Sequence, residues 1–136
     1  RQDGWKAAFP HTSHFNPNPR FDLSHDVSKA RFDHNLSLRL SDPNYQNSGS
    51  TNRWLFECLK VKRIIANRAF LKQIPQDILL MSAGKDLVVK TGIYRKVVAN
   101  LPSCKYSLYP NSKHSIYNSD DEVLIRYWNE IFAFLK

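Results

Sequence analysis

The spacing of apolar residues divides the chain near residue 74. Upstream, apolar side chains recur at helical intervals in residues 24–40 and 51–72, which predicts two amphipathic helices. We take Ser24 as the N-cap of the first, and expect one face of the second to carry Trp54, Cys58, Val61 and Ile65. Proline, asparagine and glycine predict irregular segments over residues 1–23 and 41–50. The first part of the chain is therefore expected to be two helices joined by a polar loop.

Downstream of residue 74 the pattern changes to short apolar runs bounded by turn residues, as in buried strands. We predict strands at 77–84 and 105–110, with a helix at 91–100 between them. Ser119 and Glu122 have capping-box spacing before a last helix, one face of which would carry Leu124, Trp128, Ile131 and Leu135. The order strand, helix, strand, helix predicts an α/β fold with a parallel sheet and crossover helices. We expect residues 1–73 to form a helical segment and residues 74–136 the sheet unit.

Two polar residues follow the ends of the predicted strands. Asp86 comes just after the first strand and His114 just after the second, and the carboxyl ends of parallel strands share one edge of a sheet. A carboxylate there can accept a hydrogen bond from an imidazole and fix its tautomer, so the pair is expected to act as orienting acid and base. The alternatives are that Asp86 only caps the following helix and that His114 is a solvated loop residue. His11 and His14 lack an evident third ligand, so no metal site is expected.

The formal net charge of +8 favours anionic partners. The basic helix over residues 51–72 has no recognisable nucleic-acid motif, so we do not expect nucleic acid to be the partner. Membrane contact at its basic residues is an alternative to a plain solvated face. The two cysteines have no CxxC spacing, and no apolar run reaches about 18 residues, so we expect a cytoplasmic protein. Because the chain starts at Arg1 and not at Met, we also expect its beginning to lie upstream.

Four stretches resemble the C-terminal half of an α/β-hydrolase, within the branch of bacterial lysophospholipases and monoacylglycerol lipases. "PQDILLMSAGKDLVV" (75–89) resembles the acid loop of that family, and "YPNSKHSIY" (109–117) resembles its histidine loop. "LSHDVSKARF" (23–32) and "GSTNRW" (49–54) are similar to two patterns of its cap. Ser48 stands where these lipases commonly have a second glycine, and Ser115 where Glu is frequent.

The resemblance implies a serine ester hydrolase with a Ser-Asp-His triad that uses no cofactor or metal and cleaves lysophospholipids or monoacylglycerols. Asp86 and His114 match two members of the triad. The nucleophile motif G-x-S-x-G is absent, since the glycines are Gly4, Gly49, Gly84 and Gly92. The resemblance therefore places the serine in a missing N-terminal half, makes residues 1–73 a cap, and predicts that the chain alone is inactive.

Two further expectations concern the basic helix and the alternative function. The need to take a lipid from an anionic surface suggests peripheral contact with the inner membrane through Lys60, Lys62, Arg63 and Arg68. Beside them, Phe56 is a candidate for an acyl pocket, whereas Trp54 is expected in the core. The alternative is a non-catalytic lipid- or protein-binding module derived from a hydrolase.

Overall fold

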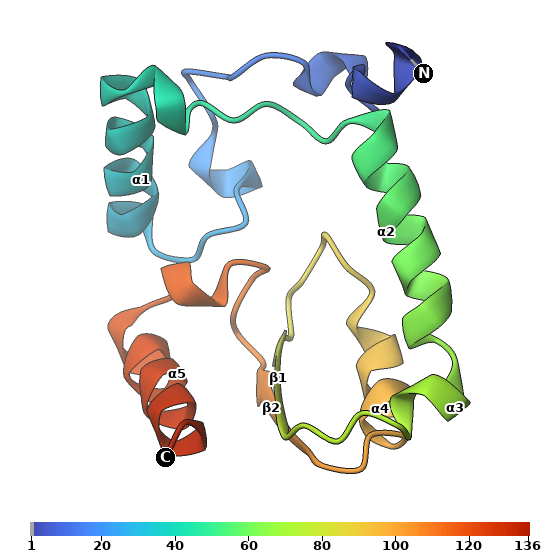
Figure 1. The fold of residues 1–136 in the computed structure, drawn as a ribbon. Helices are drawn as coiled ribbons and strands as arrows, with labels where there is room; N and C mark the ends of the chain where they lie inside the picture. The colour runs from blue at the N-terminus through green and yellow to red at the C-terminus, as the bar shows by residue number, and fades with distance from the viewer. Residues whose placement is uncertain (1) are drawn as a thin grey trace.

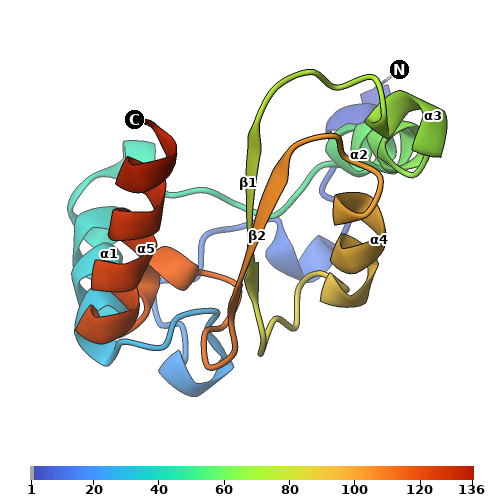
Figure 2. The ribbon, with the colours of Figure 1, turned by 90° about the horizontal axis from the view of Figure 1, so that it is seen from below.

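A two-stranded parallel sheet lies at the centre of the computed structural model, which describes residues 2–136; Arg1 lies outside the described residues. Strand β1 (Ile78–Ala83) pairs with β2 (Cys104–Tyr109) in parallel. The connection between them contains a 3-10 turn (Thr91–Ile93) and helix α4 (Tyr94–Val98), and α5 (Asp121–Phe134) follows β2. Figure 2 shows the sheet between α5 and α4. The predicted α/β class is confirmed.

The core lies between the sheet and α5. Met81 and Ala83 of β1 and Tyr109 of β2 point to this face, where Val123 and Tyr127 of α5 pack against them. The predicted apolar face of α5 is covered only in part: Leu124 and Ile131 on it are half-buried, whereas Trp128 and Leu135 are exposed. Apolar residues occupy more than one face of this helix, so their spacing alone does not select the buried one.

The predicted capping box of Ser119 and Glu122 is wrong. The N-cap of α5 is Asp120, and no side-chain hydrogen bond caps the helix. Ser119 is buried, and its hydroxyl instead donates a hydrogen bond of 3.0 Å to the hydroxyl of Ser112. Because the Ser119 hydroxyl bonds to the preceding loop, it does not cap the helix.

Helix α1 (Lys29–Ser41) begins later than predicted. Its N-cap is Ser28, whose hydroxyl accepts from the Arg31 backbone N–H, and Ser24 lies outside the helix. The backbone amides of Val27 and Ser28 donate to the carbonyl of Asn118, at 3.3 and 3.0 Å, so the preceding residues are held by a distant loop. Phe32 is the buried residue of α1.

The second predicted helix is two helices in the structure. Helix α2 (Asn52–Ile65) has Thr51 as its N-cap and Ala66 as its C-cap. Asn67 is then the N-cap of the short α3 (Arg68–Leu71). A cap residue offers its side chain to free backbone amides, so Asn67 starts a new helix where an uninterrupted one was expected. Leu71 is the buried residue of α3.

The N-terminal segment contains only short 3-10 turns, at Gln2–Trp5, Pro10–Thr12 and Phe21–Leu23, as its composition suggested. An isolated antiparallel bridge joins Ala7 to Thr51. Close by, the Gly49 amide donates to the carbonyl of Thr12, and a Cβ at position 49 would lie 1.9 Å from the Thr12 hydroxyl oxygen. The segment is therefore fastened to the loop that leads into α2.

Much apolar surface remains uncovered. Every residue of α2 except Leu55 is exposed, including Trp54 at 58%, so the expected core role of Trp54 is wrong within this chain. Figure 1 shows α2 on the side of the molecule opposite α1 and α5. The accessible surface of 10387 Å² exceeds the roughly 7,350 Å² expected for a folded monomer of 15.9 kDa. Helices α1 and α2 thus lie on opposite sides of the molecule without closing a core around the sheet.

Candidate active site

The loops that follow β1 and β2 run side by side. The Gly84 amide donates to the Tyr109 carbonyl at 2.8 Å, and the Lys85 amide donates to the Ser112 carbonyl at 3.0 Å. A Cβ at position 84 would lie 2.4 Å from the carbonyl oxygen of Pro110, closer than such atoms approach, so this crossing requires glycine. The close passage brings Asp86 and His114 together at the carboxyl ends of the strands.

Asp86 uses its two carboxylate oxygens for different purposes. Oδ1 accepts hydrogen bonds from the backbone amides of Val88 and Val89, at 2.8 and 3.0 Å, and Oδ2 lies 2.9 Å from Nδ1 of His114. The carboxylate therefore stabilises its own loop and also holds the imidazole. It does not cap the following helix, because the next helical turn, Thr91–Ile93, has Lys90 as its N-cap. The structure thus places the two predicted residues in direct contact.

Burial of the Asp86 side chain, which is 5% exposed, opposes its ionisation. Hydrogen bonds from the Val89 amide, the His114 ring and the Val88 amide outweigh that cost, and together they hold the pKa of Asp86 below its ordinary value. Near neutral pH the group is thus a carboxylate, which can only accept hydrogen bonds, so Nδ1 of His114 must carry the donated proton. The other nitrogen, Nε2, is left as the free proton acceptor of the neutral ring.

The His114 side chain is 41% exposed, so its free edge can be reached from outside. Among residues 2–136, Asp86 is its hydrogen-bond partner on the ring, and no serine hydroxyl of this part of the chain bonds to Nε2. Nor does this part of the chain gather three or more His, Cys, Asp or Glu residues that could hold a metal ion. The chemistry available to the pair is thus proton transfer at Nε2.

His25 is a neighbour of the pair that the sequence pattern did not identify. Its ring lies 6.0 Å from that of His114, edge to face at 77°, and its carbonyl accepts from the Ser115 amide at 3.1 Å. A predicted helix starting at Ser24 placed His25 on a helix surface. Ser28 is a second possible N-cap, and a helix predicted to begin there would have left residues 24–27 outside it.

A cleft of about 740 Å³ lies between α1, the 3-10 turn at Pro43–Tyr45 and the one at Ile116–Asn118. His25 and Ser115 line it, whereas His114 and Asp86 do not. Its lining mixes apolar and polar side chains, among them Phe32, Leu36, His25, Asn35 and Tyr117. Sites for small ligands usually have volumes of about 300–1,000 Å³ and a mostly apolar lining with a few polar groups. The cleft is therefore large enough for a small amphiphile.

No protein-family model matches the chain, and no curated protein matches it with significance. A solved structure does: that of a soluble variant of monoglyceride lipase from Saccharomyces cerevisiae in complex with a substrate analog. The TM-score is 0.62 and the identity 20%, over 84% of this chain and 41% of the lipase, so the chain spans less than half of that protein. At this identity the likeness establishes the fold, which is that of part of an α/β-hydrolase.

Proposed function

We propose that the chain carries the acid and base of a serine ester hydrolase whose serine lies outside these 136 residues. The observation that supports this most strongly is the 2.9 Å contact between Asp86 and His114 at the ends of two parallel strands. Sites in such sheets lie at that edge. The acid-then-base order along the chain is also that of an α/β-hydrolase triad.

In the proposed reaction the serine hydroxyl attacks the ester carbonyl while Nε2 of His114 accepts its proton. The imidazolium then returns this proton to the oxygen of the leaving alcohol, and an acyl-enzyme remains. Water, activated by the same nitrogen, hydrolyses the acyl-enzyme. Throughout, Asp86 stays ionised, keeps the Nδ1 proton in place and stabilises the imidazolium.

The proposed substrate is a single-chain lipid ester, a monoacylglycerol or a lysophospholipid. Support comes from the structural likeness to a monoglyceride lipase and from the cleft with apolar and polar walls that His25 and Ser115 line. The sequence resemblance points to the bacterial branch of such lipases, which stays part of the proposal. Residues 1–73 would then act as the cap over the acyl chain.

We further propose that α2 contacts an anionic membrane surface, as a peripheral cytoplasmic enzyme would require. The exposed stripe of Trp54, Val61 and Ile65 could enter the headgroup region, and basic residues flank it on both sides of the helix. No helix among residues 2–136 is both long and apolar enough to span a bilayer. The flanking basic residues are Arg53, Lys60 and Lys62.

The test compares residues 1–136 with the complete open reading frame that encodes them, on p-nitrophenyl butyrate, monooleoylglycerol and 1-oleoyl lysophosphatidylcholine. We expect the complete protein to hydrolyse the lipid esters and the 136-residue chain to hydrolyse none of them. Robust turnover by the chain alone would contradict the external serine. A complete protein that binds these lipids without cleaving them would instead be the non-catalytic binding module.

A further inference from the structure

The segment from Ser24 to Arg31 lies against the loop that carries His114. The Ser115 amide donates to the His25 carbonyl at 3.1 Å, and the Lys113 ammonium donates to the Ser24 carbonyl at 3.1 Å. The rings of His25 and His114 meet edge to face. Residues about 90 positions away in the sequence thus contact both chain neighbours of His114 and its ring.

Asn118 is the central point of this contact. Its side-chain amide donates to Oδ1 of Asp26 at 2.8 Å, while its backbone carbonyl accepts from the amides of Val27 and Ser28. Asn118 is buried, so these hydrogen bonds are sheltered from water and breaking them leaves unpaired groups. Asp26 therefore fixes the end of the histidine loop through Asn118.

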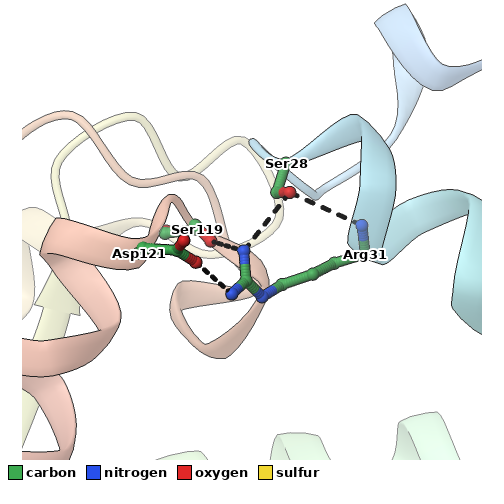
Figure 3. A network of polar contacts seen from close by, with 4 residues as sticks. All are labelled: Ser28, Arg31, Ser119 and Asp121. Atoms are coloured by element: carbon green, nitrogen blue, oxygen red, sulfur yellow. Dashed lines mark hydrogen bonds and ion pairs between the residues drawn. The ribbon is translucent and has the colours of Figure 1, made fainter.

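Arg31 forms a second connection, shown in Figure 3, where its guanidinium reaches from α1 to the start of α5. Nη1 donates to the Ser119 carbonyl at 3.0 Å and Nη2 pairs with the Asp121 carboxylate. Asp121 is 83% exposed, so solvent weakens that ion pair, whereas Ser119 is buried. The bond to the Ser119 carbonyl is therefore the stronger restraint on the loop.

Two other contacts hold the histidine loop against the first strand and its loop: the Ser112 carbonyl accepts from the Lys85 amide, and Ile116 packs in the core with Ala83 and Tyr109. Between these two contacts lies His114. Its carbonyl accepts from the Ile116 amide at 3.1 Å, and the following hydrogen bonds, from Asn118 to Ser115 and from Ser119 to Ile116, only close local turns. Such turns fix the shape of the loop. Its position relative to Asp86 depends on those contacts with the first strand and its loop and on its attachment to the Ser24–Arg31 segment.

From these contacts we propose that Asp26 and Arg31 are positioning residues for His114, and that they couple the placement of α1 to the imidazole. The inference rests on the proposed role of His114 as the base. Helix α1 starts directly after Ser28, so a displacement of the helix pulls on Asn118 and Ser119 and moves the ring relative to Asp86. A substrate that shifts the cap helix would thereby adjust the base.

The experiment uses the 136-residue chain with ¹⁵N-labelled histidine and compares the wild type with Asp26→Ala and Arg31→Gln. The ¹⁵N spectrum of the His114 ring reports which nitrogen carries the proton, and hydrogen exchange reports the protection of the Ser115 amide. The wild type is expected to show the form protonated on Nδ1. Each variant should show a mixture of the two forms and about tenfold faster exchange, the factor expected on loss of one hydrogen bond to a charged group.

Lys29→Gln is the matched control, because it removes the same charge from the same helix but breaks only the ion pair with Asp33. Asp26→Asn keeps an acceptor oxygen for Asn118 and should restore the wild-type spectrum. Unchanged ring nitrogens and exchange in Asp26→Ala and Arg31→Gln, or equal changes in Lys29→Gln, would overturn the proposal. Should Asp26→Ala lose helical circular dichroism, Arg31→Lys decides, because lysine keeps the charge but cannot contact Ser119 and Asp121 together. Neither readout requires ester hydrolysis, so this proposal and the proposed function can fail separately.

Discussion

Replacing Asp86 tests the site through the stability of the fold. Asp86→Ala removes three hydrogen bonds, two donated by backbone amides and one by His114. Asp86→Asn keeps an oxygen for the amides, but its NH₂ group cannot accept the Nδ1 proton. The two variants therefore separate the loop-capping role of Asp86 from its hold on the imidazole.

The magnitudes follow from burial. A hydrogen bond to a charged group contributes about 1.5–3 kcal/mol when sheltered. The ring of His114 is 41% exposed and Val88 and Val89 are exposed, so each of the three bonds is better taken as about 1 kcal/mol. We expect Asp86→Ala to lower the free energy of unfolding by about 3 kcal/mol and Asp86→Asn by about 1 kcal/mol.

Urea unfolding of the chain at several pH values provides the assay. The pKa of Asp86 is lower in the folded state than its ordinary value, so its ionised form stabilises the fold. That contribution is complete above the ordinary value of about 3.9 and is lost as pH falls through the lower folded pKa. Asp86→Ala should flatten the acid side of the stability curve. An acid side identical to that of the wild type, or equal losses in the two variants, would refute the assigned contacts.

Three other changes have defined outcomes. Gly84→Ala should destabilise the chain by about 1–3 kcal/mol, because the added Cβ would clash with Pro110. The control Gly92→Ala should not, because the space around Gly92 is open. Thermal unfolding that shifts equally in both variants would contradict the crossing of the two loops. Burial and the hydrogen bond to Glu130 raise the pKa of Tyr109 to about 12, so the free energy of unfolding should fall between pH 10 and 12. In an ultraviolet titration, Tyr109→Phe should lose the tyrosine step that occurs at the highest pH. A titration curve unchanged by Tyr109→Phe would contradict this assignment. Binding to vesicles rich in anionic lipid, measured by sedimentation, should weaken roughly 100-fold when Arg53, Lys60 and Lys62 become glutamine, at about 1 kcal/mol each. Binding indifferent to the change or to salt would count against docking.

The strands and the site edge could be predicted from sequence because their signals are local. "ILLMSA" is apolar except for Ser82, and turn residues bound it closely, so the end of β1 is predicted to within a residue. From there the rule for parallel sheets sufficed to bring Asp86 and His114 to one edge. Their catalytic roles stay a prediction that ester hydrolysis must test.

The helix ends and the role of His25 could not be predicted, because contacts between distant segments decide them. Ser24 and Ser28 are both possible caps, and only the bonds of residues 27 and 28 to Asn118 select the second. Ser119 fits a capping box, yet its hydroxyl bonds to Ser112. In α2, the apolar stripe predicted a buried face, but nothing within residues 2–136 covers it.

The central claim is that His114 is the base of an ester hydrolase, and one kinetic comparison tests it most directly. In the complete open reading frame, kcat for monooleoylglycerol is measured for the wild type, His114→Ala and the matched control His34→Ala, whose histidine is exposed on α1. Loss of a triad member leaves only a small residual rate, so we expect His114→Ala to reduce kcat by about 10⁴-fold or more and His34→Ala to leave it unchanged. A His114→Ala enzyme that retains the wild-type kcat would contradict the claim.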